Sequence, residues 1–349
     1  MRATMIYGPR DIRVEDADEP TLALPTDAVV RVVAACVCGS DLWPYRGVQP
    51  TPAPHPIGHE FVGLVEAVGE EVGTVKVGDF VIAPFAISDG TCPHCRNGIT
   101  TSCTELRWWG SQDSAGLVTQ GGQGDMVRVP LADGTLVALP GQPAADLVPS
   151  LLTLSDVMCT GHHAASSARV GPGSTVAVVG DGAVGLCAVL AARRLGAERV
   201  VAMSRHQARQ DLALEFGATD IVTERGEAGA ARVRQIFGGV GADAVLECVG
   251  TKESMQQSLD CTRPGGFVGY VGVPAGGPEL PIGQMFSNNL NVAGGVAPAR
   301  AYIPELLGDV LERRIAPGRV FDLELPLEEA PEAYAAMDAR RAIKVLLRP

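Results

Sequence analysis

The stretch Ser174–Gly185 reads STVAVVGDGAVG, and it decides the fold of this chain. Its first half is a run of small and apolar residues, which predicts a strand buried on both faces of a parallel sheet. Its second half places glycines at Gly180, Gly182 and Gly185, and the helix-forming segment Ala183–Leu195 follows. Because this GxGxxG pattern follows a strand and opens a helix, it predicts a dinucleotide-binding turn rather than an ordinary glycine-rich turn.

Each residue of the pattern has a physical role in such a turn. Gly180 makes the tight turn, Gly182 lets the backbone approach a pyrophosphate, and Gly185 allows the helix to pack closely on the strand. The start of the helix supplies unpaired N–H groups and a positive dipole end. We therefore expect the cofactor-binding residues to include Gly180, Gly182, Ala183, Val184 and Gly185.

Downstream of this turn, strand-like and helix-like segments alternate as far as residue 296. Further strands are expected at 198–204, 220–222, 241–250, 265–273 and 290–296, and helices at 207–216, 228–237 and 252–261. Apolar strands that alternate with helices indicate the α/β class, with a doubly wound parallel sheet.

The end of the second strand indicates which dinucleotide the site takes. An NAD site places a carboxylate there for the ribose 2′-hydroxyl, about 20 residues after the glycine turn. This chain instead has Ser204 and Arg205, with Arg209 one helical turn further on. A hydroxyl and two guanidinium groups suit a 2′-phosphate, so we expect NADP(H) in preference to NAD(H). The alternative is that the two arginines belong to an ordinary solvated helix start.

Residues 1–155 have a different pattern. Short β-type runs such as Ala28–Val33, Phe61–Val68 and Asp79–Ala83 are separated by Gly, Pro and Asp, which is typical of a partly open β-barrel. The segment after residue 296, with helices expected at 304–313 and 330–342 and a strand at 343–347, is too short for a domain of its own. We therefore expect residues 1–155 and 297–349 to form one domain, and residues 156–296 to form the dinucleotide-binding domain.

Composition excludes several classes of function. The chain has 349 residues and a net charge of −12, and an acidic surface repels phosphate backbones, so nucleic-acid binding is not expected. The longest apolar run, residues 182–192, is too short to span a membrane, and the first residues lack a signal-peptide core. We expect a soluble, cytoplasmic protein. The nine cysteines are too few for a disulfide scaffold and favour reduced thiols or metal ligands.

Three of the cysteines are clustered in a pattern typical of zinc ligands. Cys92 and Cys95 lie three residues apart and Cys103 follows in the next loop, while Asp89 repeats the three-residue offset on the other side. Asp89, Cys92, Cys95 and Cys103 would complete a tetrahedral structural zinc site. The alternative, a zinc ribbon that reads nucleic acid, is disfavoured by the acidic charge and by the lack of a second CxxC.

A second candidate metal site combines a cysteine and a histidine. Cys38 lies in CGSD and His59 in GHE, and both residue types are preferred zinc ligands. A catalytic zinc needs a third protein ligand and an open position. Spacing alone leaves four candidates for that third ligand: Asp156, Cys159, His162 and His163.

Over nearly its whole length the chain resembles the zinc-dependent alcohol dehydrogenases of the medium-chain dehydrogenase/reductase superfamily. The resemblance rests on CGSD (Cys38–Asp41), GHE (Gly58–Glu60), the cysteine lobe at about residues 89–103 and GDGAVG (Gly180–Gly185), in that order. It implies a GroES-like catalytic domain formed by both ends of the chain, with a Rossmann domain inserted between them.

The resemblance also implies roles for individual residues. Asp156 matches the third ligand of the catalytic zinc in the carboxylate variant found in bacterial secondary-alcohol dehydrogenases, beside Cys38 and His59. Glu60 is similar to a residue that can coordinate the metal transiently, and Asp41 looks like the carboxylate that orients a ligand imidazole.

Four further residues are similar to cofactor contacts of the family. Lys344 resembles a basic residue that contacts cofactor phosphates in some members, although it also fits as a surface charge. Val249 and the segment Val271–Val273 follow strand ends, where members of the family line the nicotinamide pocket with residues such as Val271 and Val273. The alternative is that these valines belong to the ordinary hydrophobic core of the strands.

The chain departs from the family pattern at two positions. Asp89 stands where the structural lobe normally has a fourth cysteine. Trp43 stands where a proton-relay histidine is often found, and because tryptophan cannot exchange protons at neutral pH, the proton must leave through Ser40, the ribose hydroxyl and water, or another group.

The expected activity is reversible hydride transfer between an alcohol, secondary alcohols included, and NADP, with Ser40, Cys38, His59 and Asp156 as the catalytic residues. The alternatives are a polyol, threonine or formaldehyde dehydrogenase of the same superfamily that uses NAD, or a cofactor-binding protein without catalysis. Family members assemble as homo-oligomers, and we expect a tetramer in preference to a dimer.

Overall fold

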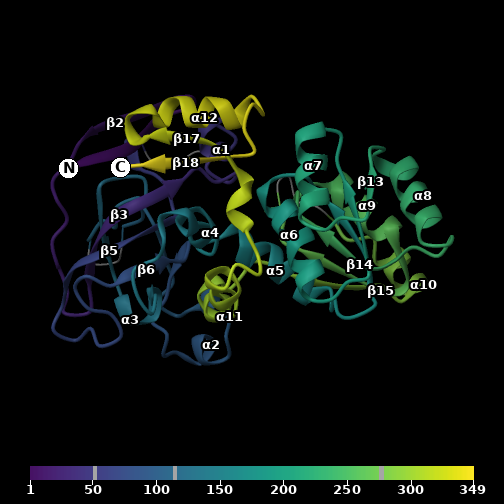
Figure 1. Ribbon diagram of the computed structural model, residues 1–349, viewed down its shortest axis with the longest axis horizontal. Coiled ribbons are helices and arrows are strands. Elements are labelled where there is room, and N and C mark those ends of the chain that lie inside the picture. The colour runs from purple at the N-terminus through teal and green to yellow at the C-terminus, as the bar shows by residue number, and fades with distance from the viewer. Residues whose placement is uncertain (50–52, 113–115, 275–278) are drawn as a thin grey trace. The chain divides into compact units, whose positions relative to one another are not determined.

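The computed structural model describes residues 1–49, 53–112, 116–274 and 279–349. The chain divides into two compact units, Met1–Asp156 with Pro298–Pro349, and Val157–Ala297 (Figure 1). The expected division had its boundaries at 155/156 and 296/297. Both chain termini therefore belong to the first unit, and the second unit is an insertion in it.

The second unit is built on a six-stranded parallel sheet with the order β13-β12-β11-β14-β15-β16. The strands are β11 (Thr175–Val179), β12 (Arg199–Met203), β13 (Asp220–Val222), β14 (Ala242–Glu247), β15 (Thr262–Tyr270) and β16 (Asn291–Gly294). The order reverses between β11 and β14, which is the switch point where ligands bind in doubly wound sheets.

Helices cover both faces of this sheet, as Figure 1 shows. They are α5 (Val157–Ser167), α6 (Ala183–Arg194), α7 (Gln207–Glu215), α8 (Gly226–Ile236), α9 (Lys252–Cys261) and α10 (Ile282–Asn288). Helices α5 and α6 pack together on one face, and α8 and α9 on the other. Alternate strand residues such as Val179, Val201 and Val245 pack against Val233 and Leu259 of the second pair of helices. The strands are buried on both sides because their apolar runs are continuous.

The first unit contains a seven-stranded sheet with the order β10-β6-β5-β3-β18-β17, in which β9 also pairs with β3. Its strands are β3 (Ala28–Cys36), β5 (Phe61–Val68), β6 (Phe80–Ala83), β9 (Met126–Val129), β10 (Val137–Ala138), β17 (Phe321–Pro326) and β18 (Lys344–Arg348). The pairing of β18 with β3 brings the last residues of the chain beside the candidate metal site. The GroES-like barrel and the Rossmann fold predicted from the sequence are confirmed.

Smaller elements complete the first unit. A second sheet has the order β2-β1-β4 and a third pairs β7 with β8. These elements are β1 (Arg2–Gly8), β2 (Asp11–Asp16), β4 (His55–Pro56), β7 (Ala86–Ile87) and β8 (Arg107–Trp108), with the helices α1 (Leu42–Tyr45), α2 (Pro93–Arg96), α3 (Ala132–Thr135), α4 (Val148–Thr153), α11 (Ala299–Leu311) and α12 (Ala330–Asp338). In the core of this unit the ring of Phe61 meets that of Trp109 edge-on, with 4.8 Å between centroids.

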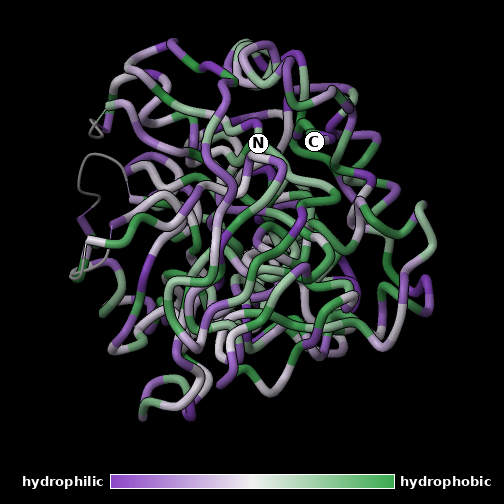
Figure 2. Tube along the Cα trace, turned by 90° about the vertical axis from the view of Figure 1, so that its left-hand side faces the viewer, coloured by the Kyte–Doolittle hydropathy of each residue, from purple (hydrophilic) through white to green (hydrophobic). Residues whose placement is uncertain are grey.

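Hydropathy changes over short distances along the chain. Figure 2 shows hydrophobic stretches that alternate with hydrophilic ones along the trace. Among the described residues, no helix is long and apolar enough to cross a membrane.

Candidate active site

Four potential metal ligands meet in the first unit. Cys38 follows β3, His59 and Glu60 precede β5, and Asp156 follows α4. One donor atom from each of the four lies within 4.8 Å of the others. The Cys38 Sγ atom is 3.6 Å and the His59 Nε2 atom 3.5 Å from Asp156 Oδ2. A thiolate, an imidazole nitrogen and a carboxylate oxygen form a donor set that suits zinc and leaves one position for substrate.

Of the four residues that spacing left open as the third ligand, Asp156 is the one that joins this group. Cys159, His162 and His163 lie on α5, in the second unit, and belong to neither group of potential metal ligands found among the described residues.

Asp41 fixes the orientation of the His59 ring. Its Oδ1 lies 3.2 Å from His59 Nδ1, so the imidazole donates from Nδ1 and its Nε2 is free to face the metal position. The other carboxylate oxygen of Asp41 accepts from the Cys38 backbone N–H at 2.9 Å and from Gln123 Nε2 at 3.4 Å. Burial alone would lower the pKa of His59, but the nearby charges of Asp41 and Cys38 raise it well above its usual value. Asp41 thus holds both the imidazole and the loop that carries the thiol.

Lys344 has a different partner from the one expected. Its side chain is 1% exposed, and its ammonium lies 2.7 Å from Glu60 Oε1 and 3.2 Å from the Val37 carbonyl oxygen. Lys344 is therefore not a surface charge, and its ammonium is not free to contact a cofactor phosphate. It is buried in the first unit as the counter-ion of Glu60. Burial would lower the pKa of Lys344, but the neighbouring Cys36 and Glu60 side chains outweigh burial and raise it well above its usual value, so the ammonium stays charged.

A cavity of about 250 Å³ adjoins the metal position. Ser40, His55, His59 and Trp109 are among the residues that line it. The Ser40 hydroxyl lies 3.5 Å from His59 Nε2, the atom that faces the metal position. His55 could not be singled out from the sequence, because a lone histidine in a β-type segment carries no motif. Trp43 lies on α1 and is not among the residues that line this cavity.

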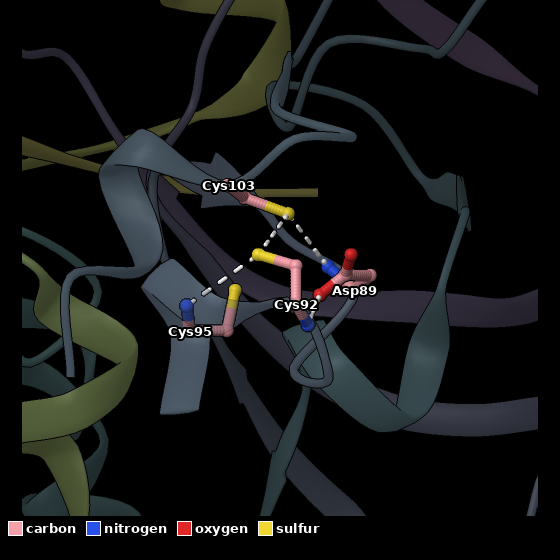
Figure 3. A group of neighbouring side chains, drawn as sticks. All are labelled: Asp89, Cys92, Cys95 and Cys103. Atoms are coloured by element: carbon pink, nitrogen blue, oxygen red, sulfur yellow. Dashed lines mark hydrogen bonds between the residues drawn. The ribbon is translucent and has the colours of Figure 1, made fainter. Parts of the chain in front are cut away.

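The second group of potential ligands is the cysteine lobe, Asp89, Cys92, Cys95 and Cys103 (Figure 3). Asp89 Oδ1 accepts from the backbone N–H groups of Thr91 and Cys92 at 2.7 and 2.9 Å. Although burial opposes it, these bonds lower the pKa of Asp89 to about 2.

The thiols of the lobe differ from one another. Cys92 is the N-cap of α2, and its Sγ accepts from the Cys95 N–H at 3.5 Å, which with other bonds lowers the Cys92 pKa to about 6. Burial and the neighbouring thiols raise the Cys95 pKa to about 12. Among the lobe's four side chains, a carboxylate and one readily formed thiolate are available to receive a cation.

The glycine turn joins β11 to α6 as the motif requires. Gly180 has φ +120°, and a Cβ added there would lie 2.9 Å from the Val249 side chain. A Cβ on Gly185 would lie 2.0 Å from the Gly180 carbonyl oxygen, so only glycine allows α6 to pack this closely. Gly182, the N-cap of α6, has no atom within 4 Å of such a position, so the backbone there is open to a ligand. Ala183 and Val184 form the first turn of α6.

The other expected cofactor contacts lie at the carboxyl ends of the strands. Val249 follows β14, and Val271 and Val273 follow β15; Val249 and Val273 are exposed, at 38% and 54%, which plain strand core would not explain. Ser204 follows β12 and is 1% exposed, whereas Arg205 is exposed.

The Ser204 hydroxyl already has a hydrogen-bond partner, Asp181, to which the sequence analysis gave no role. It donates to Asp181 Oδ2 at 2.7 Å, and Arg209 Nη1 donates to Asp181 Oδ1 at 3.2 Å. Asp181 could have been found from its place inside the glycine turn, but nothing in the sequence indicates where its side chain points.

Comparisons with known proteins agree with this geometry. Residues 24–141 match the alcohol dehydrogenase GroES-like domain family, and residues 183–312 match the zinc-binding dehydrogenase family. A probable zinc-binding alcohol dehydrogenase of Mycobacterium tuberculosis is 36% identical over 352 residues, which cover all of this chain and 89% of that protein.

Solved structures show the same similarity. An alcohol dehydrogenase from Thermus sp. ATN1 is 36% identical, with a TM-score of 0.91 over all of this chain and 99% of that one. A zinc-binding dehydrogenase from Sinorhizobium meliloti bound to NADP is 28% identical, with a TM-score of 0.82 over 100% and 99% of the two chains. The chain therefore belongs to the zinc-dependent alcohol dehydrogenases of the medium-chain dehydrogenase/reductase superfamily.

Proposed function

We propose that this chain catalyses reversible hydride transfer between an alcohol, secondary alcohols included, and NADP, and that it produces an aldehyde or ketone. The observation that carries the proposal is the meeting of the Cys38, His59 and Asp156 donor atoms beside the Ser40 hydroxyl. A thiol, an imidazole and a carboxylate from three distant parts of the chain converge where a substrate-sized cavity begins.

These three side chains would hold the catalytic zinc, with Glu60 as a transient fourth ligand. Bound there, zinc would supply Lewis-acid polarisation of the substrate oxygen. Cys38 and Asp156 are anionic ligands, so together they offset the charge of a divalent cation. Asp41 keeps the His59 ring in the tautomer that presents Nε2. Asp89, Cys92, Cys95 and Cys103 would hold the structural zinc.

Ser40 is the first acceptor of the alcohol proton. Its Oγ lies 3.5 Å from His59 Nε2, the atom that faces the metal position, so it is placed to accept that proton and pass it outward. Trp43 cannot continue this path. His55 lines the same cavity as Ser40, and burial lowers its pKa, so it is neutral near pH 7 and able to accept a proton.

The choice of NADP rests on Ser204, Arg205 and Arg209 at the carboxyl end of β12. They offer a hydroxyl and two guanidinium groups where an NAD site would have a carboxylate. Gly180, Gly182, Ala183, Val184 and Gly185 would receive the pyrophosphate, with Val249, Val271 and Val273 beside the nicotinamide. The NADP-bound relative from S. meliloti supports the same choice.

Two competing functions give different results in one assay. A polyol, threonine or formaldehyde dehydrogenase would turn over those substrates, with NAD, faster than simple secondary alcohols with NADP. A non-catalytic binding protein would bind dinucleotide without turnover.

We further propose that the protein is cytoplasmic and forms a homo-oligomer, a tetramer in preference to a dimer, as the resemblance implies.

The test is a panel of primary and secondary alcohols, polyols, threonine and formaldehyde, each with NADP⁺ and NAD⁺, on protein of measured zinc content. We expect two zinc ions per chain and the fastest turnover with a simple alcohol and NADP⁺. Cys38→Ser and Asp156→Asn should abolish turnover without unfolding the chain, whereas Cys261→Ala, at a buried thiol outside both clusters, should retain it. Full activity of a verified zinc-free protein would contradict the proposal.

A further inference from the structure

Asp181 lies inside the glycine turn, and its carboxylate points to the end of the neighbouring strand. The turn follows β11, and β12 lies beside β11, with Val179 and Met203 in register. Asp181 and Ser204 therefore follow adjacent strand ends, and their side chains meet at 2.7 Å. The chain has no acidic residue at the end of β12, but a carboxylate from the next loop lies within hydrogen-bonding distance of that position.

Both oxygens of this carboxylate are used. Oδ2 accepts from Ser204 Oγ and Oδ1 accepts from Arg209 Nη1 at 3.2 Å. The side chains of Asp181 and Arg209 are each 14% exposed, and Ser204 is 1% exposed, so the three groups form a compact, partly buried cluster. Burial opposes ionisation, but the bonds from Ser204 and Arg209 and the charge of Arg225 lower the pKa of Asp181, which keeps it anionic.

The two donors in this cluster are the groups that would otherwise bind a 2′-phosphate. A serine hydroxyl has one proton to donate, and it cannot donate that proton to a carboxylate and a phosphate at the same time. A carboxylate within 3.2 Å of the Arg209 guanidinium also repels a second anion brought to the same guanidinium. A ribose 2′-hydroxyl, in contrast, can donate to the carboxylate, as in an NAD site.

We propose that Asp181 is a specificity-determining residue that competes with the cofactor's 2′-phosphate for Ser204 and Arg209, and that also accepts the 2′-hydroxyl of an unphosphorylated ribose. The inference rests on the proposed function and deepens it. It follows that the preference for NADP over NAD is weaker than Ser204, Arg205 and Arg209 alone would give.

The test measures binding of two cofactor fragments to the full-length, zinc-loaded protein by calorimetry. Adenosine 2′,5′-bisphosphate carries the 2′-phosphate and adenosine 5′-monophosphate lacks it. Asp181→Asn should bind the bisphosphate about tenfold more tightly than the wild type, a factor that one charge-assisted hydrogen bond can supply. Its affinity for the monophosphate should be equal or lower. The control is Asp211→Asn on α7, which removes the same charge from a carboxylate bonded to Gln207, and it should behave as the wild type.

A second variant tests whether the effect acts through Arg209. In an Arg209→Gln background, Asp181→Asn should improve the affinity for the bisphosphate by less than it does in the wild type, because Ser204 is then the one contested donor of the two that remains. Weaker or unchanged bisphosphate binding by Asp181→Asn would overturn the competition and leave the proposed function standing. If that variant does not fold, Asp181→Ser gives the same readout. Failure of the folded wild type to bind either fragment would overturn the proposed function, and this inference with it.

Discussion

Replacement of Lys344 by methionine tests the buried ion pair between Lys344 and Glu60 beside the candidate metal site. Lys344 Nζ lies 2.7 Å from Glu60 Oε1, and the two side chains are 1% and 0% exposed. Methionine matches the length of the lysine stem but has no charge and no donor. After the substitution, the Glu60 carboxylate keeps its contact with the Cys36 thiol, at 3.3 Å.

The expected cost follows from that burial. Removal of one member of a buried ion pair leaves an uncompensated charge and costs about 3–5 kcal/mol of unfolding free energy. Arg348→Met is the matched control: Arg348 lies on the same strand and pairs with Glu324 at 2.9 Å, but those side chains are 35% and 55% exposed. An exposed pair contributes only about 0–1 kcal/mol. The double variant Lys344→Met with Glu60→Gln should recover at least about 2 kcal/mol, because neither charge then remains unpaired.

Urea unfolding of the zinc-loaded protein, followed by tryptophan fluorescence, measures these differences. Trp43, Trp108 and Trp109 are the three tryptophans of the chain, and all lie in the first unit, so the signal reports the unit that contains the pair. If Lys344→Met costs no more than Arg348→Met but weakens NADP⁺ binding, the assignment of Lys344 to Glu60 is refuted and its role as a phosphate contact is restored.

Three further substitutions test the site. Asp41→Asn should lower zinc affinity about 10- to 100-fold, measured by competition with a chelator, because the ligand imidazole loses the acceptor that orients it. Gly185→Ala should abolish dinucleotide binding measured by calorimetry, while zinc content is unchanged, because its Cβ would lie 2.0 Å from a backbone carbonyl oxygen. Burial lowers the pKa of His55 in the folded chain below its value in the unfolded chain. As pH falls from about 7 to 5, the imidazole is therefore protonated first in the unfolded chain, and the free energy of unfolding decreases. His55→Asn should reduce that decrease in urea titrations.

Most of the fold could be predicted because hydrophobic periodicity changes type along the chain. The helix and strand expected at 252–261 and 220–222 have the same bounds as α9 and β13. The helix expected at 304–313 was wrong at its start, because α11 begins at Ala299 and contains Pro304 in its interior. Proline favours the first turn of a helix, so the sequence pattern favoured a later start.

The candidate site was less accessible from the sequence because its contacts join distant positions. Spacing left the third zinc ligand open among four residues, and the family resemblance, not local pattern, favoured Asp156. The partner of Lys344 lies 284 positions away, and it becomes visible only when β18 pairs with β3. A buried ion pair has no local signature, since the sequence around a lysine does not indicate whether its strand is central or exposed.

Asp181 shows why a cofactor cannot be inferred from one strand end alone. The usual criterion asks whether a carboxylate follows the second strand, and here the residue at that point is Ser204. In a parallel sheet, however, the loops after all strands emerge at the same edge, so the loop after β11 can place a side chain at the end of β12. Asp181 does so from 23 positions upstream. We therefore expect that two neighbouring loops together set the charge that meets the ribose, and that Arg209 would act on the cofactor only to the extent that Asp181 releases it.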